Sequence, residues 1–246
     1  MNVNKTTARI AGIFYLIIIV SGIYAQFFVR QALLVPGDAA ATASNILASE
    51  TLFRLGITAD MAMILSDVAL GIIFYVLLKA INPGLSLMAA FFRLAQAAVL
   101  AVNLLNLFFV AELLSGAAYL AAISTAELQS WALFFLNAHA TGYAVGLLFF
   151  AMNCLVFGYL VYQSGYFPRI LGLLLIFAGF GYAADTLART LLSDYAVYEN
   201  LFGIIVFAPA VLGEVAMTLW LLIKGLNVKQ APQAPASTAP ATSATV

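Results

Sequence analysis

The stretch that decides the fold is Leu55–Leu78, which reads LGITADMAMILSDVALGIIFYVLL. Its only charged side chains are Asp60 and Asp67, and the remainder is almost entirely apolar. A helix of about 20 apolar residues crosses the roughly 30 Å hydrocarbon core of a bilayer. This stretch therefore predicts a transmembrane helix, and the two acids inside it need a partner or a function.

Comparable apolar stretches lie on both sides of this one in the chain. They are Ile10–Val29, Leu85–Ala111, Ala138–Tyr162, Ile170–Thr190 and Leu201–Ile223. The 246 residues are 65% hydrophobic and only 8% charged, whereas a soluble domain is about 25% charged. We therefore expect an all-α membrane protein, a bundle of six transmembrane helices whose main partner is the lipid bilayer. The net charge of zero gives no indication of a nucleic-acid partner.

Basic residues are unevenly divided between the two sides of the predicted bundle. On the side of the N-terminus lie Lys5, Arg9, Lys79, Arg169, Lys224 and Lys229, and on the opposite side lie Arg30, Arg54 and Arg189. The positive-inside rule then predicts a multi-pass protein of a bacterial plasma (inner) membrane with both termini in the cytoplasm. An even number of spans requires the same placement of the two termini.

The domain organisation follows from the composition. We expect residues 1–228 to form one polytopic transmembrane domain, in which the basic start and the long first apolar stretch form an uncleaved span rather than a signal peptide. Residues 229–246 are rich in Ala, Pro, Ser and Thr and predict a disordered cytoplasmic tail.

The connections between spans also carry signals. The turn at Asn82-Pro83-Gly84 and the one at Gly165–Pro168 are short, so each joins two antiparallel neighbours. Asp38–Ser49 predicts a short interfacial helix capped by Asp38. Ser124 and Glu127 have the spacing of a capping box, which starts a helix that either continues into the fourth span or bends near Thr141.

Three ionisable residues lie near the middle of different spans. Asp67 is about 18 Å from either end of its span, Glu214 is similarly central, and the long side chain of Arg93 reaches the same depth. We expect these three to form a polar centre that binds a ligand. Two acids and one Arg give a net negative charge, so one carboxyl is expected to hold a proton.

A second group of polar residues lies nearer the outer face: Asp60, Asp185, Arg189, His139 and Arg54. A further polar stripe in the third span contains Gln96, Asn103 and Asn106. One interpretation is a polar cavity along the axis of the bundle. The alternative is that these side chains hold helices together by pairing and hydrogen bonding.

Signatures of enzyme chemistry are absent from the sequence. A single His and a single Cys, Cys154, offer no pair for zinc or haem, and no metal site or cofactor is expected. No nucleophile elbow or phosphate-binding loop is present. Enzymatic activity stays uncertain, with the balance against it.

Three functional hypotheses remain open. The first is a module that binds or transports a small solute or protons through Asp67, Arg93 and Glu214. The second is a non-catalytic sensor or accessory protein, or a homo-oligomer, that acts on a partner in the membrane, for which Gly142 and Gly146 form a helix-contact motif. The third is a membrane-embedded enzyme that modifies lipid or cleaves protein.

Several short motifs follow one another along the chain. They are Ala8-Arg9-Ile10-Ala11-Gly12, Gly37-Asp38, Leu52-Phe53-Arg54-Leu55-Gly56, Phe92-Arg93-Leu94, Phe167-Pro168-Arg169-Ile170-Leu171-Gly172, Gly181-Tyr182, Gly213-Glu214 and Trp220-Leu221-Leu222-Ile223-Lys224-Gly225. With them the chain resembles the bacterial membrane family catalogued as domain of unknown function four-three-eight-six. The resemblance extends from Ala8 to about Val228 and implies a single polytopic domain of the inner membrane. It implies no activity, substrate or catalytic residue.

Overall fold

The computed structural model describes residues 3–227, and within them every regular element is a helix. The elements are α1 (Lys5–Ile23), the π-helix η1 (Tyr24–Arg30), α2 (Gln31–Leu33), α3 (Ala39–Ala48), α4 (Glu50–Leu78), α5 (Pro83–Leu113), the 3-10 turn η2 (Ala118–Leu120), α6 (Thr125–Ser164), α7 (Arg169–Leu191) and α8 (Tyr195–Ile223). Six helical segments are long and apolar enough to cross a membrane, which confirms the expected all-α, multi-pass architecture. The tail predicted for residues 229–246 lies outside the described part of the chain.

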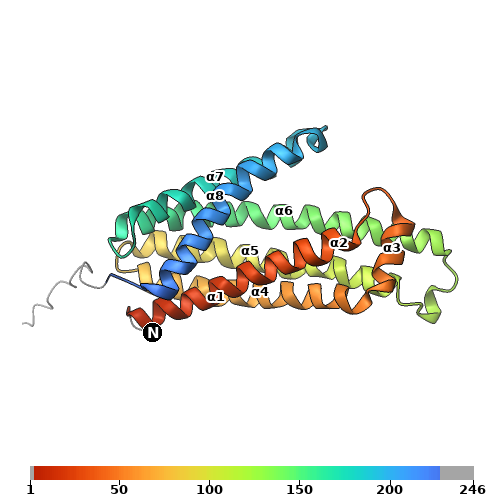
Figure 1. The fold of residues 1–246 in the computed structure, drawn as a ribbon, viewed down its shortest axis with the longest axis horizontal. Coiled ribbons are helices and arrows are strands. Elements are labelled where there is room, and N and C mark those ends of the chain that lie inside the picture. Colours follow the sequence, from red (N-terminus) through yellow and green to blue (C-terminus); the bar gives the residue numbers. More distant parts are fainter. Residues whose placement is uncertain (1–2, 228–246) are drawn as a thin grey trace, which may run out of the picture.

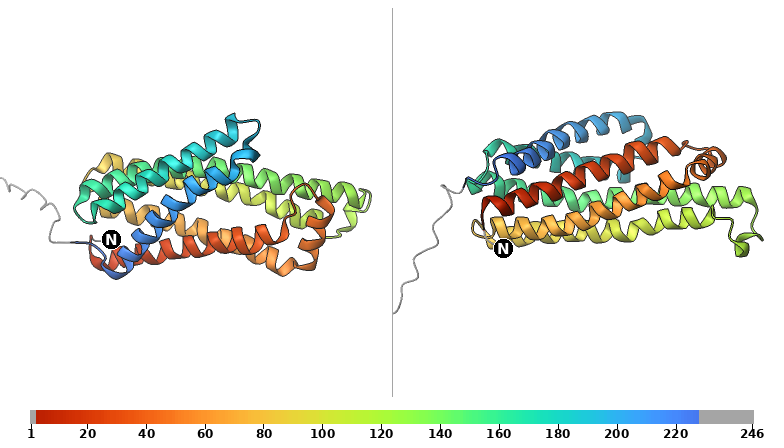
Figure 2. Two further views of the ribbon diagram at one scale, coloured as in Figure 1. Left: turned by 45° about the horizontal axis from the view of Figure 1, so that its top comes forward. Right: turned by 60° about the horizontal axis from the view of Figure 1, so that its bottom comes forward.

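The six long helices form a closed ring, in which each packs against the next one along the chain. α4 packs on α5, α5 on α6, α6 on α7 and α7 on α8, while α1 packs on both α4 and α8 and so closes the ring. The two short turns therefore join neighbouring helices, as the sequence predicts. Figures 1 and 2 show that α8 crosses the bundle obliquely and that the far ends of α7 and α8 project away from it.

Helix starts follow the capping signals in the sequence. The side chain of Asp38 accepts a hydrogen bond from the backbone N–H of Ala41 at 2.9 Å and so begins α3. Ser124 and Glu127 form the predicted capping box, and α6 continues unbroken from there into the membrane span. Because hydropathy detects only the part of a helix that suits hydrocarbon, the predicted spans are shorter than the helices that contain them.

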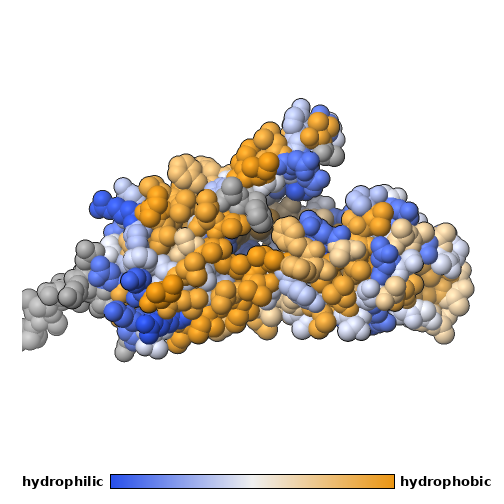
Figure 3. Space-filling model, viewed as in Figure 1, coloured by the Kyte–Doolittle hydropathy of each residue, from blue (hydrophilic) through white to orange (hydrophobic). Residues whose placement is uncertain are grey.

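The outward faces of the helices are apolar, as contact with lipid requires. Large side chains such as Leu65 (72% exposed) and Phe91 (61% exposed) point away from the ring. Figure 3 shows hydrophobic residues along the middle of the molecule and hydrophilic residues gathered toward its two ends. This distribution fits a protein whose middle lies in hydrocarbon and whose ends lie in water.

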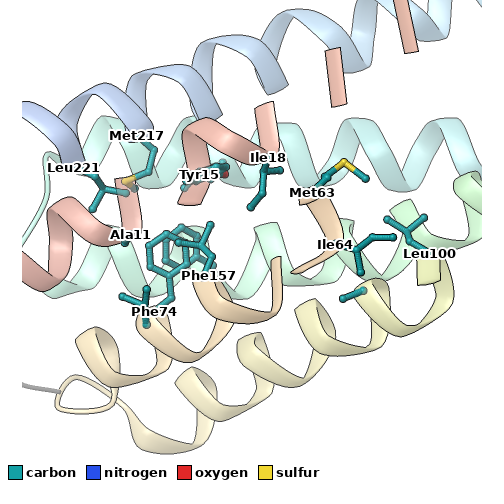
Figure 4. Packing of buried hydrophobic residues seen from close by; sticks show 14 of the residues in the cluster. Ala11, Tyr15, Ile18, Met63, Ile64, Phe74, Leu100, Phe157, Met217 and Leu221 are labelled. Atoms are coloured by element: carbon teal, nitrogen blue, oxygen red, sulfur yellow. The ribbon is translucent and has the colours of Figure 1, made fainter. Parts of the chain in front are cut away.

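The interior is packed with apolar side chains toward the end where α1 begins and α8 ends. The rings of Phe74 and Phe157 stack there with their centroids 4.2 Å apart. Met217 and Leu221 of α8, both fully buried, lie beside them (Figure 4). Apolar side chains therefore fill the inside of the ring at this end.

Two glycines, Gly158 of α6 and Gly172 of α7, allow the backbones of these two helices to pack closely together. A Cβ atom on Gly158 would lie 2.7 Å from the backbone oxygen of Gly172, and one on Gly172 would lie 2.5 Å from that of Gly158. A Cβ atom essentially never lies this close to a heavy atom to which it is not bonded. Neither position accepts a larger residue unless the two helices move apart.

Replacing Gly158 by alanine should therefore lower the free energy of unfolding by about 1–3 kcal/mol, the usual cost of overpacking. The matched control is Gly203→Ala in α8, where a Cβ would meet nothing within 4 Å. Reversible unfolding of the purified variants in mixed detergent micelles measures the difference. Equal stability of the two variants would show that α6 and α7 are not held this closely.

Candidate functional site

Arg93 of α5 and Asp67 of α4 form a fully buried ion pair at the middle of the bundle. The Nη2 atom of Arg93 lies 2.7 Å from Oδ1 of Asp67, and each side chain is only 1% exposed. Gln96, one turn beyond Arg93, donates a hydrogen bond from its Nε2 to Oδ2 of Asp67 at 3.2 Å. Charge neutralisation within the pair makes its burial in hydrocarbon tolerable, since an unpaired charge there is costly.

The guanidinium of Arg93 is also held by α6 and α1. Oδ1 of Asn153 accepts a hydrogen bond from Nη1 of Arg93 at 3.2 Å, while Nδ2 of Asn153 donates to the backbone oxygen of Ala89 at 2.7 Å. The rings of Tyr15 and Phe150 lie within 5.4 and 5.3 Å of the guanidinium carbon, which is cation–π distance. Arg93 is thus fixed in position by three neighbouring helices.

Glu214 of α8 lies close to this pair but binds a different partner. The hydroxyl of Tyr182 on α7 donates a hydrogen bond to Oε1 of Glu214 at 2.8 Å, and a hydrogen bond from Tyr15 also reaches this carboxyl. Glu214 interacts electrostatically with Arg93 and Asp67, yet among residues 3–227 it forms no ion pair. The structure therefore brings two of the three expected residues into contact and places the third beside them.

We define the polar centre as Asp67, Arg93, Gln96, Asn153, Tyr182 and Glu214. All of these except Glu214 and Tyr182 are buried; these two are partly accessible. Two buried atoms of the centre, Nε of Arg93 and Oε1 of Gln96, have no hydrogen-bond partner among the described residues. A cavity of about 10 Å³, which is room for one water molecule, adjoins Arg93 and Asn153. The centre therefore has unused hydrogen-bonding capacity.

The polar residues nearer the outer face fall into two clusters rather than one group. In the first cluster, Nη1 of Arg30 on η1 pairs with Oδ2 of Asp60 on α4. The guanidinium of Arg30 lies over the ring of Tyr143 on α6, and the ring of His139 adjoins that of Tyr143. From the sequence alone, Arg30 counts only as one of the basic residues on the outer side of the bundle. It turns inward because η1 is a π-helix, whose wider turn rotates the residues that follow it.

The second outer cluster lies where α7 meets the start of α8. Nε of Arg189 lies 2.9 Å from Oδ2 of Asp185, and the hydroxyl of Tyr195 donates a hydrogen bond to Oδ1 of the same acid. Burial, together with this hydrogen bond, raises the pKa of the Tyr195 hydroxyl. Arg54 belongs to neither cluster, because it forms an exposed ion pair with Glu50 at the start of α4.

A comparison with known proteins places the chain in a family. The family model described as "Domain of unknown function (DUF4386)" matches residues 10–225. The chain belongs to this family. An uncharacterized protein of Archaeoglobus fulgidus is 28% identical over 173 residues, which cover 70% of this chain and 85% of that protein. No solved structure matches.

In this member of the DUF4386 family, part of the polar stripe of α5 serves helix packing. Nδ2 of Asn103 donates a hydrogen bond to the backbone oxygen of His139, and Asn106 donates to Asn103. Gly142 faces Asn103, and Gly146 faces Leu100. The glycine motif of α6 is therefore used against α5 within the chain, and it does not present a free surface to a partner.

Several residues in or next to the polar centre were not identified from the sequence. Asn153 is a lone amide in a long apolar stretch, which is a signal that sequence reasoning can use. Tyr15, Phe150 and Tyr182 carry no such signal, because aromatic residues are common in membrane spans. Only the three-dimensional contacts of Tyr15 and Phe150 with Arg93, and of Tyr182 with Glu214, distinguish these three from other aromatic side chains.

Proposed function

We propose that this protein spans a bacterial-type plasma membrane six times, with both termini in the cytoplasm, and binds a proton or a small polar solute at its polar centre. The orientation is supported by Lys5, Lys79 and Arg169, which lie at the ends of helices on one side of the ring. That side carries more basic residues than the other, in keeping with the positive-inside rule.

The observation that carries the proposal is the charge of the centre. It holds one cation, Arg93, and two carboxyl groups, of which only Asp67 forms an ion pair. An ionised Glu214 would leave one uncompensated negative charge in a medium that penalises it. Binding one proton or one positively charged group removes that penalty, so Glu214 is the residue at which a ligand acts.

The other residues of the centre have positioning roles. Gln96 and Asn153 hold Asp67 and Arg93 in place. Tyr182 orients the carboxyl of Glu214 by donating a hydrogen bond to its Oε1. If the centre served packing alone, the paired Arg93 and Asp67 would suffice, and a second acid beside them would add only cost.

Proton binding is tested by measuring uptake on acidification. The purified protein, in detergent with an indicator dye, should take up one more proton per chain than Glu214→Gln does. Glutamine keeps an oxygen that can accept the hydrogen bond from Tyr182, so the variant should fold. The matched control Glu112→Gln removes an exposed acid at the end of α5 and should lose only the uptake of a solvent-exposed carboxyl at lower pH. Equal uptake curves for Glu214→Gln and the wild type near neutral pH would overturn the proposal.

A further inference from the structure

Figure 3 shows a hollow between α1 and α8, about midway along the molecule. It arises because α8 packs on α1 along only part of its length and then crosses away from it, as Figures 1 and 2 show. Apolar side chains are exposed on both helices, for example Val20 of α1 and Ile204 of α8. Within a membrane, such an opening faces hydrocarbon, so a molecule that enters through it must dissolve in lipid.

The end of the interior where α1 begins and α8 ends offers no comparable entrance. Phe74, Phe157, Met217 and Leu221 fill the space inside the ring there, and each is 5% exposed or less. The cavity beside Arg93 holds no more than a single water molecule. This end therefore gives a ligand larger than water no route to the polar centre, whereas a hollow lies at the side of the bundle between α1 and α8.

Glu214 is the partly accessible charged residue of the polar centre. Arg93 and Asp67 are 1% and 0% exposed, whereas Glu214 and its hydrogen-bond partner Tyr182 are partly accessible. Only one oxygen of Glu214 accepts from Tyr182. The carboxyl of Glu214 is thus the accessible acidic group of the polar centre, whereas the ion pair of Arg93 and Asp67 is buried.

The titratable groups around Glu214 come from every helix of the ring. They are Tyr15 of α1, Asp67 of α4, Arg93 of α5, Tyr143 and Cys154 of α6, and Tyr182 of α7. Arg93 is the only cation in this set, and Asp67 already neutralises it. The surroundings therefore repel a second anion and favour one added positive charge.

The aromatic residues at the centre narrow the class of cation. Tyr15 and Phe150 already lie at cation–π distance from Arg93. The ring of Tyr182, edge-to-face with Phe150 at 5.2 Å, is partly accessible and adjoins Glu214. Aromatic rings bind organic ammonium groups through their negative faces. A metal ion such as Ca²⁺ instead takes six or more oxygen ligands, which one carboxyl and two phenols do not supply.

From these observations we infer that the polar centre binds a monovalent organic cation with an apolar body, such as an aromatic quaternary ammonium, which enters between α1 and α8. The inference rests on the proposed role of Glu214. The cation and a proton compete for the same carboxyl: when the cation binds, the proton leaves Glu214 for the medium, and the total charge of the centre is unchanged. No covalent bond other than this O–H bond forms or breaks.

Benzyltrimethylammonium is a suitable probe, because neopentylbenzene has the same shape with carbon in place of the charged nitrogen. Titration calorimetry of the full chain in detergent, repeated in buffers of different ionisation enthalpy, measures both affinity and proton release. We expect saturable binding of the cation with one proton released per cation. In the range where Glu214 holds a proton, the Kd should rise about tenfold for each unit by which the pH is lowered. The neutral isostere should not bind saturably.

Two variants complete the test. Glu214→Gln should abolish saturable binding, whereas Glu112→Gln should bind as the wild type does. Failure of the wild type to bind the cation, or binding of both probes equally, would overturn the inference. It would leave the proposed function standing if acidification still gives the extra proton uptake. Loss of that uptake difference between the wild type and Glu214→Gln would overturn both.

Discussion

Replacing Arg93 by methionine should lower the free energy of unfolding by about 3–5 kcal/mol, the typical cost of breaking a buried ion pair. Methionine keeps the apolar stem of Arg93 but leaves Asp67 as a buried carboxyl with only Gln96 as its hydrogen-bond donor. The side-chain oxygen of Asn153 would also lose the hydrogen bond that it accepts from Arg93. Reversible unfolding in mixed micelles, followed by the loss of helical circular dichroism, measures the change.

The double variant Arg93→Met with Asp67→Leu separates charge from packing. Because no unpaired charge remains, it should regain most of the lost stability, since apolar replacements of buried pairs are often neutral or stabilising. Proton binding by the double variant should still occur at Glu214. If the double variant is as unstable as Arg93→Met, the cost comes from side-chain volume, and the ion pair is not what makes Arg93 tolerable in the membrane.

The second large effect is expected at the outer ion pair between Arg30 and Asp60. Asp60→Asn should lower the free energy of unfolding by about 2 kcal/mol, since the hydrogen bond loses its charged acceptor and Arg30 stays partly buried without a counter-charge. The Asp60 side chain is 2% exposed and that of Arg30 only 12%. The matched control is Glu50→Gln, which breaks the pair with Arg54, both of whose side chains are 60% exposed.

The control Glu50→Gln should lower the free energy of unfolding by well under 1 kcal/mol, because exposed ion pairs usually contribute little to stability. The same unfolding assay compares the two variants, and repeating it at high salt separates them further, because only the exposed pair is screened. A cost for Asp60→Asn no larger than that for Glu50→Gln would show that η1 does not hold Arg30 against α4.

The six helices and two of their neighbouring pairs could be predicted because lipid imposes a simple rule. Any stretch that crosses hydrocarbon must be apolar and helical, and short turns such as Asn82-Pro83-Gly84 force neighbours together. The same rule makes buried charges pair, which is why the contact between Asp67 and Arg93 follows from the sequence. The capping residues Asp38 and Ser124 act locally, so their effect is also visible without the structure.

The remaining features depend on rotation and crossing of whole helices, which no local pattern specifies. The π-helix at the end of the first span turns Arg30 inward, although its sequence is as apolar as that of an ordinary helix. Glu214 of α8 forms a hydrogen bond with Tyr182 of α7 and no ion pair with Arg93, which pairs with Asp67. Depth along a helix could be counted from the sequence, but the direction in which each side chain points could not.

Infrared difference spectroscopy tests the central claim most directly, because a protonated carboxyl has a carbonyl-stretching band that an ionised one lacks. Spectra of the purified protein in lipid, recorded at acidic minus neutral pH, should contain such a band from a buried acid. The band should be absent from Glu214→Gln and unchanged in Glu112→Gln. Persistence of the band in Glu214→Gln, or its absence from the wild type at every pH, would contradict the assignment of Glu214 as the proton-binding residue.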